Sequence, residues 1–139
     1  FRDCRRIRKF YQEQVELILA LLDRYFSQSI DLAKYLAVCE QLGQEPDPNK
    51  MPPEMEDYPS EVQQAFLVHS CLPDRWDGMS GMFMGKDWSA LGTLLDVFEV
   101  DDPRTTVYFL KAIDDRNSNS INEKVTQRNK AAKAKARIK

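Results

Sequence analysis

Histidine and cysteine are scarce in this chain of 139 residues, and their scarcity argues against several classes of site. The single histidine, His69, has no Gly-x-Ser-x-Gly motif near it, which argues against a serine hydrolase. The three cysteines are widely spaced and form no Cys-x-x-Cys pair, which argues against a disulfide framework and a structural zinc site. His69 and Cys71 stand two positions apart on a predicted helix, where they do not share a face, so we expect both to be semi-buried. We therefore expect a reducing cytosol, no enzymatic activity, no metal and no cofactor.

Long apolar runs and strand patterns are also missing. No run approaches the roughly 18 apolar residues of a membrane-spanning helix, and the basic start lacks the apolar stretch and cleavage site of a secretory signal. No alternating strand pattern of useful length and no internal repeat is present. Because the chain starts at Phe1, we expect it to be a fragment or to have lost its start. Its composition, 42% hydrophobic and 30% charged, is that of one globular domain with a core.

Two pairs of adjacent carboxylates are the remaining candidates for acid–base chemistry or metal binding. Asp101-Asp102 stands directly before a proline, so we expect this pair to cap a helix. Asp114-Asp115 falls within a predicted helix, where we expect both carboxylates to lie on an exposed, solvated face. The twelve-residue ligand pattern of an EF-hand is absent. Neither pair therefore indicates catalysis or metal binding.

Helical periodicity dominates the first part of the chain. Apolar residues at steps of three and four predict a helix over residues 5–42. This length exceeds an average helix, and Ser27-Gln28-Ser29 is a soft spot where it could break into two. Gly43 is a natural stop for the helix. The acidic, proline-rich residues 43–58 that follow form either a covered connector or a peptide-like docking segment.

Three further helices are predicted. One covers residues 59–71 and has a proline in its first turn, and another covers residues 88–98 with Asp87 as its N-cap. The last begins with Asp102 as N-cap and Pro103 at the first helical position. The sequence thus predicts an all-α single domain of four or five helices without a sheet. It has a long N-terminal helix or helix pair, a loop rich in glycine and methionine, and a long C-terminal helix.

The apolar stripes of these helices predict which side chains form the core. We expect the following to be largely buried: Ile18, Phe66, Trp88, Leu91, Leu95, Phe98, Leu110 and Ile113.

Residues 72–101 hold both tryptophans, four of the five glycines and three of the five methionines. The glycines mark turns or close backbone approaches, and methionine fills irregular gaps in a core, so a compact half-buried loop is one interpretation. The other is an adaptable apolar contact surface for a partner protein. The candidate contact residues are Trp76, Met79, Met82, Phe83 and Met84.

Gly85-Lys86 superficially resembles a phosphate-binding loop. Ser80 stands where that motif needs its first glycine, and Asp87 stands where it needs serine or threonine. A carboxylate at this place would repel phosphate, so we expect no nucleotide site here.

Charge is distributed unevenly along the chain. Residues 1–10 carry a net charge of +4, residues 122–139 carry +6, and the residues between them carry −12. We therefore divide the chain into a helical domain, residues 1–125, and a basic tail, residues 126–139, that is either helical or frayed. The candidate electrostatic residues of the tail are Arg128, Lys130, Lys133, Lys135, Arg137 and Lys139. Phosphates or the acidic surface of another copy could hold this tail, and we expect the second.

The stretch from Leu72 to Gly81, LPDRWDGMSG, and the triplet Gly85-Lys86-Asp87 resemble small helical proteins of tailed bacteriophages. The resemblance covers about the middle third of the chain and carries over no functional residue. It implies a non-enzymatic role in virion or tail assembly, as a chaperone, an accessory structural subunit or a packaging component. It also implies a location in the host cytoplasm or within a virion.

We therefore expect a protein-interaction subunit whose partners are other protein subunits, including copies of itself. The alternative is a nucleic-acid-handling subunit, such as a small packaging protein, that grips DNA through its basic tail. DNA binding of that kind weakens steeply as salt rises, which separates the two hypotheses. We expect no membrane partner and no small-molecule substrate.

Overall fold

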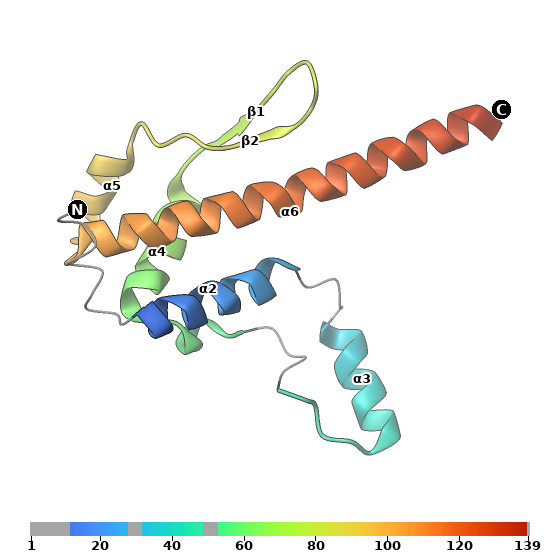
Figure 1. Cartoon of the computed structure of the whole chain (residues 1–139), viewed down its shortest axis with the longest axis horizontal. Coiled ribbons are helices and arrows are strands. Elements are labelled where there is room, and N and C mark those ends of the chain that lie inside the picture. The colour runs from blue at the N-terminus through green and yellow to red at the C-terminus, as the bar shows by residue number, and fades with distance from the viewer. Residues whose placement is uncertain (1–11, 28–31, 49–52, 139) are drawn as a thin grey trace.

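The structure is a computed structural model that describes residues 12–27, 32–48 and 53–138 (Figure 1). In chain order its elements are α2 (Gln12–Ser27), α3 (Leu32–Leu42), the 3-10 turn η2 (Met55–Asp57), α4 (Ser60–Cys71), β1 (Asp74–Trp76), β2 (Phe83–Lys86), α5 (Leu91–Val97) and α6 (Pro103–Ile138). The predicted all-α class with a long C-terminal helix is confirmed. The predicted absence of any sheet is wrong, because β1 and β2 form a short antiparallel hairpin.

The N-terminal helical pattern forms the predicted helix pair. α2 and α3 are separate helices, and the proposed break at 27–29 falls at the end of α2, although residues 28–31 and 1–11 lie outside the described residues. α3 ends where predicted, because Gly43 adopts a φ of +64° that other residues avoid. Figure 1 shows α3 standing away from the other helices.

The connector after α3 is tied to the helical body at several points. The Tyr35 hydroxyl accepts a hydrogen bond from the Asp47 amide at 3.0 Å, and Arg24 donates to the Pro48 carbonyl at 3.2 Å. Farther on, the buried Tyr58 donates its hydroxyl to the Leu21 carbonyl at 3.1 Å. Burial raises the pKa of this phenol to about 12. The described part of the segment is therefore tied to the body, but most of it is exposed and only Pro53 and Tyr58 of its described residues are buried, so the covered-connector interpretation is not confirmed.

The core lies where α2, α4 and α6 meet. Leu22, Val62, Phe109 and Leu110 are fully buried there. Each such side chain contributes about 1.5–3 kcal/mol by leaving water. At the edge of this core, Arg116 of α6 donates to Asp23 of α2 at 2.7 Å, which adds a polar contact between these two helices.

The predicted core is confirmed at three positions, Ile18, Leu110 and Ile113. The other five predicted residues are partly buried and pack against this core: Phe66, Trp88, Leu91, Leu95 and Phe98. Most of these residues belong to α5 or flank it. α5 is only seven residues long and covers one side of the core, so solvent reaches its outer half.

Two predicted helix starts differ from the structure. Asp87 does not cap α5, because its carboxylate accepts hydrogen bonds from the amide and hydroxyl of Ser89, and the helix begins later, after Ala90. Pro59 is the N-cap of α4 and not its first helical residue. α6 begins as predicted, since Asp102 accepts from the amide and the hydroxyl of Thr105.

α6 runs without interruption for 36 residues, which at a rise of about 1.5 Å per residue gives a length of about 54 Å. Its residues from 126 to 138 are helical and exposed, so the tail is a helical extension and is not frayed. Among the described residues, no helix combines the length and the apolarity needed to cross a membrane.

Candidate interaction surface

Side chains of α6 hold strand β2 in place at two points. Asp114 contacts the backbone at Lys86, and Asn122, two turns farther along the helix, contacts the backbone at Phe83. Since residues four apart lie on one helix face, Asp114, Ser118 and Asn122 form a polar row beneath the strand. The hairpin is therefore fixed to α6 and is not a free loop.

Asn122 pairs with both backbone polar groups of Phe83. Its Oδ1 accepts from the Phe83 amide at 2.8 Å, and its Nδ2 donates to the Phe83 carbonyl at 3.0 Å. The Phe83 ring is buried and meets the Trp76 ring edge-on, with ring centroids 4.9 Å apart. This double contact sets the position of β2 along the helix and thereby the position of Trp76 on the opposite strand.

Gly85 is required where β2 passes Asp114. Its φ is +88°, which L side chains rarely adopt, and a Cβ at this position would lie 3.1 Å from Asp114 Oδ2. The glycine therefore allows the strand backbone to approach the carboxylate closely.

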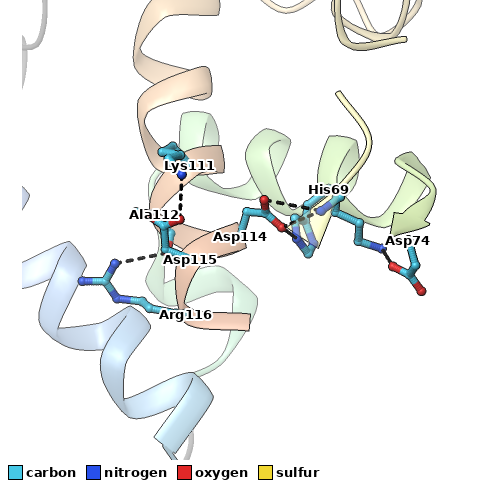
Figure 2. A network of polar contacts seen from close by, with 8 residues as sticks. His69, Asp74, Lys111, Ala112, Asp114, Asp115 and Arg116 are labelled. Atoms are coloured by element: carbon cyan, nitrogen blue, oxygen red, sulfur yellow. Dashed lines mark hydrogen bonds and ion pairs between the residues drawn. The ribbon is translucent and has the colours of Figure 1, made fainter. Parts of the chain in front are cut away.

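Asp114 also binds His69 of α4, and Figure 2 shows the two side chains pointing toward each other. His69 Nε2 donates to Asp114 Oδ1 at 3.2 Å, and both side chains are about nine-tenths buried. Burial lowers the pKa of His69, although the hydrogen bond that His69 donates to Asp114 opposes this effect. At the edge of the same network, Lys86 Nζ lies 2.7 Å from Asp74 Oδ1.

This network corrects two predictions. Both carboxylates of the Asp114-Asp115 pair were expected to be exposed, but Asp114 is buried and hydrogen-bonded. Asp115 is exposed as predicted, and it accepts a hydrogen bond from Lys111 at 2.8 Å. His69 and Cys71 were both expected to be semi-buried, but His69 is buried and Cys71 is exposed. Asp114 lies on the α6 face that α4 and β2 cover, and one position in an α-helix turns the side chain by about 100°, so its neighbour faces solvent.

The five candidate contact residues are divided between the surface and the interior. Trp76, Met79 and Met84 are 53%, 97% and 55% exposed. Met82 is half-buried, and Phe83 is buried against Trp76, so Phe83 supports the hairpin and does not present a contact surface. The hairpin thus displays three large apolar side chains to solvent.

A groove of about 330 Å³ lies between the hairpin tip and α6. Its apolar lining comes from Trp76, Ile121 and Val125, and its two cations are Lys124 and Arg128. Ser80, Gly81 and Asn129 complete the lining. The carboxylate of Asp77 shapes the tip by accepting from the Met79 amide at 3.1 Å and the Ser80 hydroxyl at 2.6 Å, and these bonds lower its pKa.

The basic tail residues lie along the last three turns of α6. Arg128 lines the groove, and Lys130, Lys133, Lys135 and Arg137 are exposed beyond it. Lys139 lies outside the described residues. Within the part of the chain that the structure describes, no group of three or more histidine, cysteine or acidic side chains is arranged to hold a metal ion.

Sequence reasoning missed the residues that hold the hairpin, namely Asp114 and Asn122, and the groove residues Lys124 and Asn129. One signal was present: Asp114, Ser118 and Asn122 recur every four residues beside the apolar stripe of α6. Such a row is also the pattern of a solvated helix face, so the spacing alone does not indicate that the helix binds another backbone.

Comparison of the chain with protein families, curated proteins and solved structures finds no match in any of the three. The functional argument therefore depends on the geometry of the surface.

Replacing Asn122 by alanine should loosen the hairpin. The change leaves the Phe83 amide and carbonyl without their partner, which should destabilise the protein by about 1–3 kcal/mol. Denaturant unfolding followed by tryptophan fluorescence measures the loss. Asn119→Ala, an exposed asparagine one turn earlier on the same helix, is the matched control and should change little. Equal effects of the two substitutions would contradict the anchoring role of Asn122.

Proposed function

We propose that this chain is a non-enzymatic protein-binding subunit and that the hairpin with the adjoining part of α6 is its contact surface. The observation that carries the proposal is the exposure of Trp76, Met79 and Met84 on a hairpin that α6 holds in one position. Clustered exposed apolar side chains are typical of protein interaction sites, and tryptophan is enriched among residues that dominate binding energy. A fixed surface also loses little conformational entropy on binding.

The groove beside the hairpin indicates the chemistry of the partner. It combines an apolar lining from Trp76, Ile121 and Val125 with cations from Lys124 and Arg128. A complementary surface would present an apolar side chain flanked by carboxylates. The acidic middle of the chain, with its net charge of −12, has this character, so another copy is a suitable partner.

The resemblance of residues 72–81 and 85–87 to small bacteriophage proteins supports a more specific role within this class. We infer a structural or tail-assembly protein that acts in the host cytoplasm or within a virion. Multiple weak contacts between copies suit such a role, because assembly then depends on concentration.

The test compares the wild type with a variant that carries Trp76→Ala, Met79→Ala and Met84→Ala. Light scattering over a concentration series should show oligomers of the wild type, and the variant should dissociate about tenfold more readily or more. Leu17→Ala, which removes an equally exposed apolar side chain from α2, is the control and should leave association unchanged. Wild-type association that the triple substitution does not weaken would count against the hairpin as the contact surface.

The second candidate function is nucleic-acid handling, which the run of five basic and no acidic residues over 126–138 favours. Removing residues 126–139 and measuring DNA binding across a salt series tests it. If the wild type binds DNA tightly at physiological salt, stays monomeric, and loses DNA binding on truncation, the protein-binding proposal is wrong.

A further inference from the structure

The face of α4 that is turned away from α6 carries a second groove. It has a volume of about 590 Å³ and is lined by Met55, Ser60, Gln63, Gln64, Phe66 and Leu67. The buried residues of α4, among them Val62 and Ala65, face the core on the opposite side of this helix. With about 100° between successive residues, Ser60, Gln63, Gln64 and Leu67 lie opposite the core positions of α4, and Phe66 lies at the boundary between the groove and the core.

Negative charge lies at one edge of this groove. The turn η2 contributes Met55 to the lining, and the turn with its N-cap residue carries the exposed carboxylates of Glu54, Glu56 and Asp57. No lysine or arginine is among the described residues that line it. The groove therefore combines an apolar floor with an acidic edge, which is the chemistry that suits a basic segment with some apolar surface.

The end of α6 is such a segment. Residues 126–138 carry five basic groups and no acidic one, and all are exposed. Ala131, Ala134 and Ile138 follow one another at steps of three and four, so they form a narrow apolar strip on one helix face. Ile138 is 86% exposed, so the described residues of its own copy leave most of it uncovered.

The end of α6 and the groove of the same copy cannot meet. α6 is one continuous helix, so its end cannot fold back toward α4. Figure 1 shows the red end of α6 pointing away from α4, and the groove lies on the far side of α4. Within the described residues, the end of α6 is the basic helix with this pattern, so a second copy is the source of the occupant.

We propose that the end of α6 of one copy lies in the Met55–Leu67 groove of a second copy. Ala131, Ala134 and Ile138 pack on the apolar floor, and the flanking cations face the carboxylates of the η2 turn. The inference rests on the proposed protein-binding function and names one contact within it. Because the contact joins two different surfaces, repetition builds rings or filaments, and reciprocal exchange between two copies builds a dimer.

Two charge-reversed variants test this contact. The tail variant carries Lys130→Glu, Lys133→Glu, Lys135→Glu and Arg137→Glu. The groove variant carries Glu54→Lys, Glu56→Lys and Leu67→Lys. Each variant alone should dissociate about tenfold more readily than the wild type or more. In an equimolar mixture, the intact groove of the tail variant should bind the intact tail of the groove variant. The mixture should therefore give a 1:1 pair that neither variant forms alone.

The matched control places the same substitutions on another surface. Glu13→Lys, Glu16→Lys and Leu17→Lys likewise replace two glutamates and one leucine, at three exposed positions of α2. This control should associate like the wild type and should not pair preferentially with the tail variant. Circular dichroism verifies that every variant is folded.

The outcomes separate this contact from the proposed function. If the hairpin substitutions weaken association and the tail and groove variants do not, the α6–groove contact is wrong and the proposed function stands. If the tail and groove variants weaken association and pair when mixed, the contact is supported whatever the hairpin substitutions do. A wild type that stays monomeric at every concentration overturns the contact, and tail-dependent DNA binding by that monomer would overturn the proposed function as well.

Discussion

Replacing Phe109 by alanine should destabilise the protein by about 3–5 kcal/mol. The Phe109 side chain is fully buried where α6 meets α2 and α4, and it is the largest of the fully buried side chains. Alanine would remove most of its apolar area and leave a cavity that neighbouring side chains on three helices cannot easily fill. Because small domains are stable by only about 5–15 kcal/mol, the variant should be near the limit of folding.

Urea unfolding followed by circular dichroism measures this loss through the shift of the midpoint. Tyr108→Ala is the control, because it truncates the adjacent aromatic side chain, which is 39% exposed and contacts Phe109 only edge-on. We expect it to cost less than about 1.5 kcal/mol. If both substitutions cost the same, α6 packs on the core through a different face.

The helices of the core could be predicted from the sequence more easily than the precise face of each helix. Leu110 and Ile113 stood out as part of an apolar stripe and are buried. Phe109 did not, because the buried face of α6 also contains Thr105 and Thr106, which interrupt the apolar pattern. The helix face that packs is therefore wider than its aliphatic residues indicate, because α2 and α4 both cover it.

The hairpin could not be predicted from local pattern. Its strands are three and four residues long, and β2 contains Gly85, so no alternating pattern develops. A two-stranded hairpin of this size is marginal by itself in water. Its stability depends on Asp114 and Asn122, which lie 28 and 39 positions away from the backbone amides that they bind. Contacts across such distances leave no mark on a short window of sequence.

The candidate contact residues could be predicted only in part, because their exposure depends on the same hairpin. Exposure of Trp76, Met79 and Met84 follows from their place on a hairpin, and Phe83 is buried because it faces α6. Only the pairing of the strands decides which of these neighbouring apolar residues faces solvent. The basic tail, in contrast, was evident from composition, since its charges depend on no partner within the chain.

Replacing Asp114 by alanine should destabilise the protein by about 2–4 kcal/mol. The change leaves the buried His69 Nε2 and the part-buried Lys86 amide without their acceptor, at a site where the His69 side chain is about nine-tenths buried. Asp115→Ala is the matched control, because the adjacent Asp115 is exposed and pairs with the exposed Lys111 (Figure 2). A surface pair of this kind contributes about half a kcal/mol or less. Equal losses would show that Asp114 is not the acceptor that holds α4, α6 and β2 together.

The same network should make stability depend on pH through His69. Its pKa is lowered in the folded state, mainly by burial, below the ordinary value of 6.5 that applies when the chain unfolds. Between these two pKa values the unfolded chain binds more protons, so the stability from a neutral His69 is complete above about pH 6.5 and decreases as the pH falls. Asp114 and Asp74 oppose this effect and Lys86 adds to it, but burial is the largest contribution.

The free energy of unfolding of the wild type should therefore decrease more between about pH 7 and pH 5 than that of a His69→Gln variant, which keeps a donor for Asp114 and cannot titrate. If the wild type instead gains stability relative to the variant as the pH falls, His69 is protonated in the folded protein and forms an ion pair with Asp114.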